Sequence, residues 1–509
     1  MKSKIVPASA ITAALVLTGC AGPSGGGGPD DVADDGVFRI ALAGDPGSLD
    51  PQSGVTSTLG QMNRFLYDSL VNTLDGEVVS GLAEEWTETD NTIVFTLHDG
   101  ITCADGSPLT ASDVAANITY VGDASKASPM GGFAFPLGTT ATADDAERTV
   151  TMTTPETTGF LLNTLSLFPI VCATGMADRA SLDATPAGTG PYTLGAAVAG
   201  SSYTLERRDD YAWGPDGAGT DAPGIPKTIE VSVSANATTT ANQLLGGELN
   251  AGTVFGPDAD RLEGAGLHSS PLDAIIGEII YNQNPGRPTA DAEVRRALTQ
   301  ALDLTALTEV AGAGSAQASP ALTGLNLCES DLTALLPDQD VDAAHNALAG
   351  ADLPELTVAY FDLGAASVAT AELVVSQLGE VGVSAKAVAV SFTDLNTVLF
   401  QNAEFDIALL PLDGTTPTSI QPQVSGPTNP NGGQNFANIA NAEYDTLSAQ
   451  AKAMPGTTGC ELWNQADVAL VEGADIIPFA TDDYPVWAAR AEFTTYFGTV
   501  LPTTIRMLG

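Results

Sequence analysis

The feature that most constrains the fold is an alternation of strand-like and helix-like patterns over residues 356–412. Short apolar runs rich in β-branched residues predict strands at 356–360, 383–390 and 405–412. Helical spacing of apolar residues predicts helices in the two intervening segments, 366–378 and 392–403. Parallel strands need crossover connections of about this length, so the order β–α–β–α–β predicts a mostly parallel sheet covered by helices. We therefore expect an α/β protein.

The rest of the body carries the same kinds of pattern less regularly and without internal repeats. At 509 residues the chain is long enough for about three domains. Apolar alternation predicts further strands at 37–42, 91–97, 203–208, 228–233 and 275–283. Helical spacing predicts helices at 57–74, at 110–121 with Thr110 and Asp113 in the capping positions, and at 291–307.

The N-terminus has the form of an export signal. Lys2 and Lys4 precede an apolar stretch, 5–17, that is too short to cross a bilayer as a helix. The ending Leu-Thr-Gly-Cys at 17–20 resembles the lipobox of bacterial lipoproteins, in which the cysteine is lipidated and becomes the first residue. We expect a signal peptide at 1–19 and a lipidated Cys20 with a flexible tether at 20–35, holding the protein on the outer face of the cell membrane. The alternative is ordinary secretion with cleavage near Ala21.

Four cysteines remain if Cys20 carries lipid: Cys103, Cys172, Cys328 and Cys460. An even number in an exported protein favours disulfides, and four cysteines allow three pairings. We favour Cys103 with Cys172 and Cys328 with Cys460, because each pair falls within one expected lobe or subdomain. The body contains no CxxC motif, so we do not expect a zinc site.

The charge balance excludes one class of function. The sequence has 62 acidic and 18 basic residues, whereas a nucleic-acid-binding protein needs cations to neutralise phosphates. Attraction of cationic ligands is one explanation of the acidity. Solubility is the favoured one, since salt screens exposed charge beyond about 8 Å.

The motifs of common enzymes are missing or misplaced. The three histidines, His98, His268 and His345, have no neighbours at metal-ligand spacing, and neither HExxH nor GxxxxGK[ST] occurs. A GxSxG match at 22–26 lies in the tether, where no strand-to-helix turn can form a nucleophile elbow. The glycines at 188–190 predict a tight turn and not a phosphate loop, since Pro191 has no amide donor. We expect no catalytic residues, metal or cofactor.

Seven segments, taken in order, resemble the family-5 solute-binding proteins, the peptide, nickel and oligosaccharide receptors of ABC importers. The longest is TIVFTLHDGITCADGSPLTASDV at 92–114, the most distinctive block of that family. The others are GDPGSLDP (44–51), FLYDSLVN (65–72), GLAEEW (81–86), GTGPYTL (188–194), YTLERRDDYAWG (203–214) and EVRRALTQALD (293–303).

The resemblance implies a two-lobed periplasmic-binding-protein-like fold with an inserted subdomain in the first lobe. Mapped onto this chain, the first lobe is 36–68, 188–284 and 480–509, the insertion is 69–187 and the second lobe is 285–479. The implied function is capture of an oligopeptide or dipeptide between the lobes, as a monomer, for an ABC permease and its ATPase subunits. The alternatives are a sugar, a metal chelate or another small solute, and, from other classes, a secreted hydrolase or an adhesive surface protein.

The resemblance also implies candidate ligand-binding residues. Peptide-binding relatives hold the ligand as an added strand, with an aspartate on its amine. Asp413 is the nearest acid here, but the Gly-Trp pair that precedes it in the family is absent, and a turn residue is the alternative. The other candidates are the backbone of Gly47, Ser48 and Leu49, Asn284 at the lobe junction, and the aromatic rings of Tyr484 and Trp487, for each of which core packing is the alternative.

Overall fold

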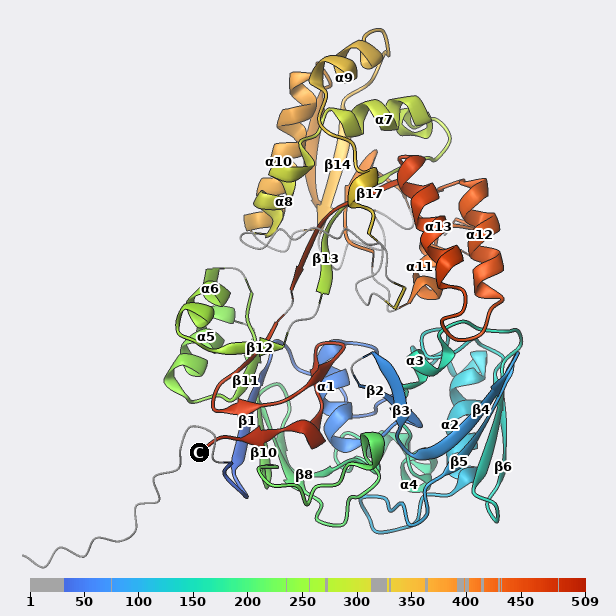
Figure 1. The fold of residues 1–509 in the computed structure, drawn as a ribbon, viewed down its shortest axis with the longest axis vertical. Helices are drawn as coiled ribbons and strands as arrows, with labels where there is room; N and C mark the ends of the chain where they lie inside the picture. The colour runs from blue at the N-terminus through green and yellow to red at the C-terminus, as the bar shows by residue number, and fades with distance from the viewer. Residues whose placement is uncertain are drawn as a thin grey trace, which may run out of the picture.

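A computed structural model describes residues 32–74, 76–234, 236–255, 257–270, 273–312, 327–328, 331–361, 365–390, 398, 402–412, 416–428, 431, 433–483 and 485–509. Figure 1 shows two bodies, one above the other, joined on one side by extended strands. None of the helices in these residues is long and apolar enough to cross a membrane. The predicted α/β class is confirmed, with several sheets and with helices packed against them.

The first lobe is built on a seven-stranded sheet made from distant parts of the chain. Its order is β12-β18-β11-β1-β10-β9-β8, and β1 lies parallel to β10 and β11. The predicted strands at its centre are confirmed, because alternation correctly marks which side chains face the core. The strands are β1 (Val37–Leu42), β8 (Tyr192–Val198), β9 (Ser202–Arg207), β10 (Thr228–Val233), β11 (Ala251–Thr253), β12 (His268–Ser270) and β18 (Val486–Ala488).

Helix α1 (Ser57–Leu66) is shorter than the helix expected over 57–74. The backbone becomes extended at Tyr67, and the chain then forms the hairpin of β2 (Val71–Leu74) and β3 (Glu77–Ser80). The apolar residues at 70 and 74 continued the helical spacing by coincidence: Leu70 is fully buried just before β2, and Leu74 is the half-buried last residue of that strand. Helix α5 (Ala237–Gly246) and helix α6 (Pro257–Gly264) complete this lobe.

The insertion expected over 69–187 contains a four-stranded antiparallel sheet of order β4-β5-β7-β6. Helix α2 (Ala111–Gly122) packs on β6 and β7, and it begins with the expected capping box of Thr110 and Asp113. Two short helices, α3 (Leu161–Leu165) and α4 (Ala173–Ala177), connect the subdomain to the first lobe. The strands are β4 (Ala83–Thr89), β5 (Thr92–Leu97), β6 (Thr140–Asp144) and β7 (Thr149–Thr153).

The second lobe has a five-stranded sheet of order β15-β14-β16-β13-β17. The strands of the predicted β–α–β–α–β unit, β14 (Leu356–Phe361), β15 (Ala385–Val390) and β16 (Ile407–Leu409), are parallel as expected. Strand β13 (Asp273–Tyr281) runs antiparallel to β16 and to β17 (Ile476–Asp483), so the sheet is mixed. The helix expected at 392–403 lies largely outside the described residues.

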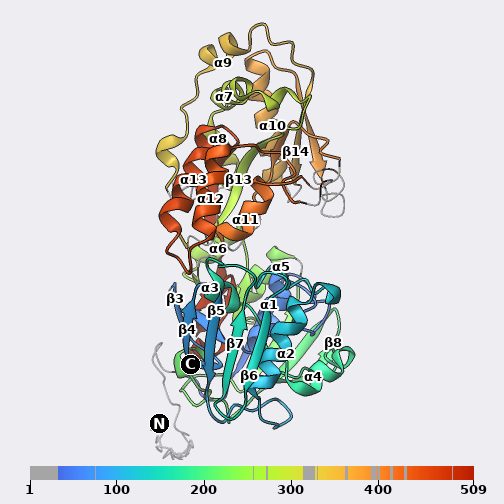
Figure 2. The same ribbon diagram turned by 90° about the vertical axis from the view of Figure 1, so that its right-hand side faces the viewer.

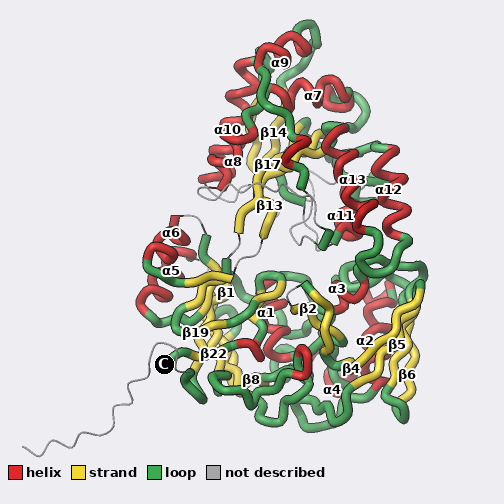
Figure 3. Tube along the Cα trace, in the orientation of Figure 1, coloured by secondary structure: helices red, strands yellow, loops and turns green. Residues whose placement is uncertain are grey.

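Helices lie on both sides of this sheet: α8 and α10 on one side, and α12 and α13 on the other (Figure 3). The helix expected at 291–307 is divided in two at Asp303, whose carboxylate accepts a hydrogen bond from the Ala306 amide at the start of the second helix. The helices are α7 (Ala292–Gln300), α8 (Leu304–Gly312), α9 (Val341–Leu348), α10 (Ala365–Glu380), α11 (Pro417–Val424), α12 (Ala442–Lys452) and α13 (Cys460–Glu472).

Two neighbouring chain segments connect the lobes. The chain leaves the first-lobe sheet after β12 and enters the second-lobe sheet at β13, and it returns from β17 to β18. Each pair is antiparallel, so the outgoing and the returning segments lie side by side in both sheets, and the β13–β17 pair forms a two-stranded ribbon on the second-lobe side of the crossings. The two bodies that these segments join lie one above the other in both views (Figures 1 and 2). The crossings therefore lie between 270 and 273 and between 483 and 486. The boundaries expected at 284/285 and 479/480 differ, because β13 and most of β17 pair within the second lobe.

Candidate functional site

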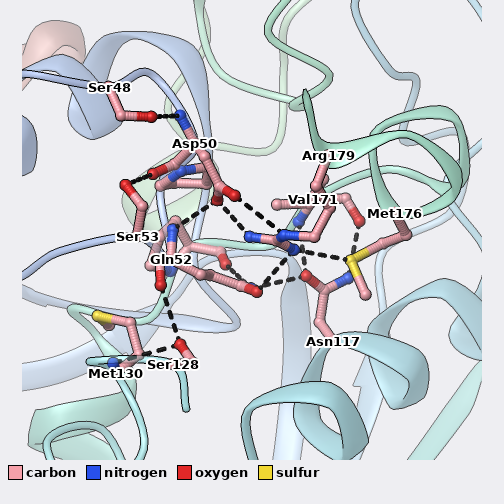
Figure 4. Close-up of polar contacts among 12 residues, drawn as sticks. Ser48, Asp50, Gln52, Ser53, Asn117, Ser128, Met130, Val171, Met176 and Arg179 are labelled. Atoms are coloured by element: carbon pink, nitrogen blue, oxygen red, sulfur yellow. Dashed lines mark hydrogen bonds and ion pairs between the residues drawn. The ribbon is translucent and has the colours of Figure 1, made fainter. Parts of the chain in front are cut away.

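The loop that follows β1 is held by a polar network (Figure 4). Asp50 and Arg179 form a bidentate ion pair through Nε and Nη2 of the guanidinium, with 3.0 Å from Nε of Arg179 to Oδ2 of Asp50. The same guanidinium donates to the Gln52 side chain at 3.1 Å. A paired, partly buried Arg–carboxylate contact of this kind fixes orientation as well as distance, so the loop is rigidly placed relative to α4.

Gln52 extends the network into the inserted subdomain. Its amide donates to Oδ1 of Asn117 on α2 at 2.7 Å and to the Pro169 carbonyl at 3.0 Å. The Asn117 amide in turn donates to the Val171 carbonyl at 2.7 Å, and Ser128 donates to the Gln52 carbonyl at 2.9 Å (Figure 4). Gln52 and Asn117 are buried and their side chains are hydrogen-bonded, so the loop, the first lobe and the insertion form one unit.

A cavity of about 90 Å³ lies beside α1, where the first lobe, the insertion and the C-terminal segment meet. A space of this size holds a few water molecules or a small side group. Most of its walls are apolar or aromatic, contributed by Val55, Tyr67, Met130, Phe133, Leu167, Pro169, Tyr211, Phe497 and Leu501. Its polar wall includes Arg64, Asn63 and Asp68.

Arg64 gives the cavity its electrostatic character. Its guanidinium lies over the Tyr496 ring, 5.5 Å from the centroid, and donates to the Ser166 carbonyl at 3.1 Å. Its Nη2 has no hydrogen-bond partner among the described residues. Burial lowers the pKa of Arg64, and the nearby Tyr496 and Asp68 oppose that change. An arginine remains charged in proteins, so the cavity has a positive group next to apolar walls.

In the second lobe a buried carboxylate supports the chain just before residues 413–415. Glu278 on β13 is fully buried, and its Oε2 accepts a hydrogen bond from the Leu412 amide at 2.6 Å. Burial raises the pKa of Glu278 to about 8 and that of Asp467 on α13 to about 8. Glu278 therefore positions the segment that leads to Asp413 and is protonated below neutral pH.

This pair makes stability depend on pH. Because the folded-state pKa values exceed the unfolded ones of about 4, the folded protein binds more protons between about pH 5 and pH 8. The free energy of unfolding contributed by these groups is therefore present at the acidic end and lost as pH rises towards 8. We expect Glu278→Gln to flatten the pH profile of urea unfolding over this range. Glu461→Gln, on an exposed part of α13, is the control and should leave the profile unchanged; equal profiles for the two variants would contradict the assignment.

Comparison with known proteins decides the family. Residues 77–432 match the family described as bacterial extracellular solute-binding proteins, family 5 middle. The chain belongs to this family. It is 27% identical to Protein XP55 of Streptomyces lividans over 312 residues, which is 59% of this chain and 55% of that protein. It is 40% identical to the periplasmic murein peptide-binding protein MppA of Escherichia coli over 96 residues, 18% of each chain. The chain thus aligns with about half the length of XP55 and less of MppA.

Solved structures extend the likeness over most of the chain. A substrate-binding protein from Microbacterium hydrocarbonoxydans, in complex with 4-hydroxybenzoate hydrazide, superposes with a TM-score of 0.73 at 27% identity and covers 92% of this chain and 99% of its own. CtaP, an ABC transporter substrate-binding protein from Listeria monocytogenes, has a TM-score of 0.79 at 21% identity, over 93% of this chain and 100% of its own. The expected two-lobed fold of the solute-binding family is confirmed.

In this family-5 protein, the backbone groups expected to contact a ligand are used internally. The Leu49 amide donates to Asp183 at 2.8 Å, and the Leu49 carbonyl accepts from the Tyr67 hydroxyl at 2.9 Å. Ser48 donates its hydroxyl to Asp183, and the Gly47 amide donates to Asp45 at 2.7 Å. These contacts stabilise the loop, and the Gly47 and Leu49 amides donate their hydrogen bonds within the protein.

Asn284 lies away from the lobe junction, whereas Trp487 lies just after the last crossing, where it was expected. The nine residues of β13, at about 3.3 Å each, carry Asn284 to the end of the strand remote from the hinge, where its amide donates to Asn282. Trp487 is buried in the first lobe, and its indole N–H donates to the Val254 carbonyl at 2.8 Å. This burial favours core packing for Trp487, and contact of its ring with a ligand stays a prediction. Asp413, Tyr484 and Cys20 lie outside the described residues.

The four body cysteines form two disulfides in the pairing that the sequence favoured. Cys103 is joined to Cys172, and Cys328 to Cys460, across 69 and 132 residues. No sequence pattern pointed to the polar residues of the loop network and the cavity, which are Gln52, Asn117, Arg179 and Arg64. Gln52 and Asn117 lie just beyond two of the recognised blocks, but no local pattern separates them from ordinary polar residues, because their partners are more than 50 residues away.

Proposed function

We propose that this chain is an extracellular receptor that captures a small solute between its two lobes and delivers it to the permease of an ABC importer. The observation that carries the proposal is the family match over 77–432, combined with two lobes joined by a two-stranded ribbon. A ribbon of this kind bends at a few residues and lets two rigid bodies move against each other. In the first lobe, the polar network of the loop keeps the backbone rigid, and the cavity beside α1 is partly apolar. Together they give this lobe a preformed surface for a ligand.

An oligopeptide or dipeptide is the ligand class that we favour, and a sugar, a metal chelate or another small solute is the alternative. MppA is named as a murein peptide-binding protein, and the Microbacterium protein was solved with an aromatic hydrazide. Apolar walls with one guanidinium suit a ligand that combines an apolar group with an anionic or electron-rich one. We propose that Asp413 binds the amine of a peptide, with Tyr484 as a neighbouring contact.

The anchoring and partners follow from the same proposal. We propose that Cys20 carries the lipid, that residues 20–35 form the tether, and that the receptor acts as a monomer with a permease and its ATPase subunits. The family is one of solute-binding proteins, and we propose that this member has no enzymatic activity. A secreted hydrolase is the rival from another class, and it would need a nucleophile with a base.

Thermal unfolding with candidate ligands tests the receptor function. We use the mature chain with Cys20→Ser, so that no lipid is attached, against short peptides, sugars, metal chelates and aromatic hydrazides. A specific ligand at about 100 times its dissociation constant adds about 2.7 kcal/mol to the free energy of unfolding. We expect peptides to raise the melting temperature and Asp413→Asn to remove most of that rise.

The other outcomes have distinct meanings. A response to another ligand class alone would keep the receptor function and replace the peptide. A peptide response that Asp413→Asn leaves intact would remove Asp413 from the site and favour its role as a turn residue. No response to any class, together with turnover in a hydrolase screen, would overturn the receptor function.

A further inference from the structure

The two lobes also touch on the side away from the β13–β17 ribbon. In Figure 1 the loop between α12 and α13 of the second lobe reaches down to α3 of the inserted subdomain. Gly159 and Gly456 pair there as an isolated parallel bridge, and the Phe160 amide donates to the Gly456 carbonyl at 3.0 Å. The lobes are thus in contact on two opposite sides.

Phe160 is the centre of this second contact. Its side chain is 0% exposed and packs with Cys328, Ala451 and Trp463, all of the second lobe. Leu327, Cys460 and Leu462 pack around the same cluster. A side chain of the first lobe is therefore buried in a socket of the second lobe, and parting the lobes would expose both the ring and the socket to water.

The wall of the socket depends on the Cys328–Cys460 disulfide. That bond fastens residues 327 and 328 to the first turn of α13, beside Trp463. The disulfide thus holds apolar residues in place around the Phe160 ring, in addition to cross-linking the second lobe.

The backbone at Phe160 is in an unusual conformation. Its φ of 58° lies in the left-handed region, which a phenylalanine adopts only when its surroundings impose it. The preceding residue is Gly159. An added Cβ there would lie 3.3 Å from the Met454 carbonyl oxygen, so the backbones of the two lobes approach closely at this point. At the rim, Lys452 and Glu156 form an exposed ion pair of 3.5 Å between the lobes.

We propose that Phe160 and its socket form a latch, which holds the lobes together on the side opposite the hinge and must release before they can open. The latch deepens the proposed receptor function, on which its biological meaning rests, by naming the step that controls entry and release of solute. While the Phe160 ring lies in its socket, the lobes are held at two places, the hinge ribbon and the socket. The only rotation left to them is about the axis that joins these two places. Release of the ring frees the hinge ribbon to bend.

A distance measurement on ligand-free protein tests the latch. Spin labels are placed at Asp90→Cys in the insertion and Glu443→Cys at the start of α12, both exposed, in the mature chain with its disulfides intact and Cys20→Ser. We expect one short distance to dominate. Phe160→Ala should raise the ratio of long-distance to short-distance molecules about tenfold or more, because burying a phenylalanine favours the docked state by at least that factor.

A matched control and a milder variant accompany this test. Phe168→Ala removes an equally buried ring that packs on Phe135 inside the insertion, and it should leave the distances unchanged. Lys452→Glu should shift the distances in the same direction as Phe160→Ala but less, and adding Glu156→Lys should restore them.

Three results would overturn the latch: a wild-type distribution already dominated by the long distance, no change in Phe160→Ala, or an equal change in Phe168→Ala. The readout needs no ligand, so failure of the latch and failure of the receptor function are separate results. Opening of Phe160→Ala without any ligand response in thermal unfolding would support the latch and weaken the receptor proposal.

Discussion

Replacing Arg295 by methionine is expected to lower the free energy of unfolding by about 3–5 kcal/mol. Arg295 on α7 is buried and pairs with the buried Asp475 at 2.8 Å. Its guanidinium also donates to the carbonyls of Gly473 and Ala474, which lead into β17. Methionine fills the space of the arginine stem but leaves the Asp475 carboxylate without its counter-ion and these carbonyls without a donor, and that loss is what makes the substitution costly.

The neighbouring arginine provides the control. Arg296→Met changes the same residue type on the same helix, but Arg296 is about half exposed and pairs with the exposed Glu293 one turn away. An exposed pair of this kind is worth well under 1 kcal/mol. Urea unfolding of both variants, followed by circular dichroism, gives the comparison. Losses of similar size for Arg295→Met and Arg296→Met would show that the Arg295–Asp475 pair does not hold α7 to β17.

Removing the disulfide between Cys103 and Cys172 is expected to cost about 4 kcal/mol. The bond closes a loop of 69 residues. Cross-linking a loop of that length lowers the entropy of the unfolded chain and so raises its free energy by about this amount. Both sulfurs are buried in the core of the insertion, so Cys103→Ser with Cys172→Ser also places two hydroxyls in an apolar setting.

Guanidinium unfolding of the double-serine variant, of Cys103→Ala with Cys172→Ala, and of the oxidised wild type separates these effects. The free energy of unfolding of the alanine variant should fall nearly as much as that of the serine variant, because both lack the crosslink and only the serine variant buries hydroxyls. A loss below about 1 kcal/mol in the alanine pair would mean that the unfolded chain is already compact around this loop.

Much of the local structure could be predicted from the sequence because it depends on short-range patterns. Alternation identified β1 and β10, a short apolar run identified β14, and the capping pair Thr110 and Asp113 identified the start of α2. The same patterns did not locate the ends of two helices, because each end depends on a single residue. Asp303 ends the run of α7 by capping α8, and the extended backbone at Tyr67 ends α1.

The candidate site was harder to predict, because periodicity shows that a side chain is buried but not what it is buried against. Trp487 was expected near a ligand and lies in the first-lobe core, while the Leu49 amide and carbonyl are occupied by Asp183 and Tyr67. Arg179 and Gln52 meet only because the insertion folds back on the first-lobe loop, 127 residues apart in sequence.

The sequence by itself determined the family, the α/β class, most element types and a cysteine pairing in which each bond stays within one lobe or subdomain. These depend on composition, periodicity and motif order, all of which can be read locally. Only the tertiary structure decided where the hinge ribbon lies and that Phe160 enters a socket around Trp463. The physical reason is that both depend on which surfaces meet across the lobes, and a contact between segments some 300 residues apart leaves no pattern in either segment alone.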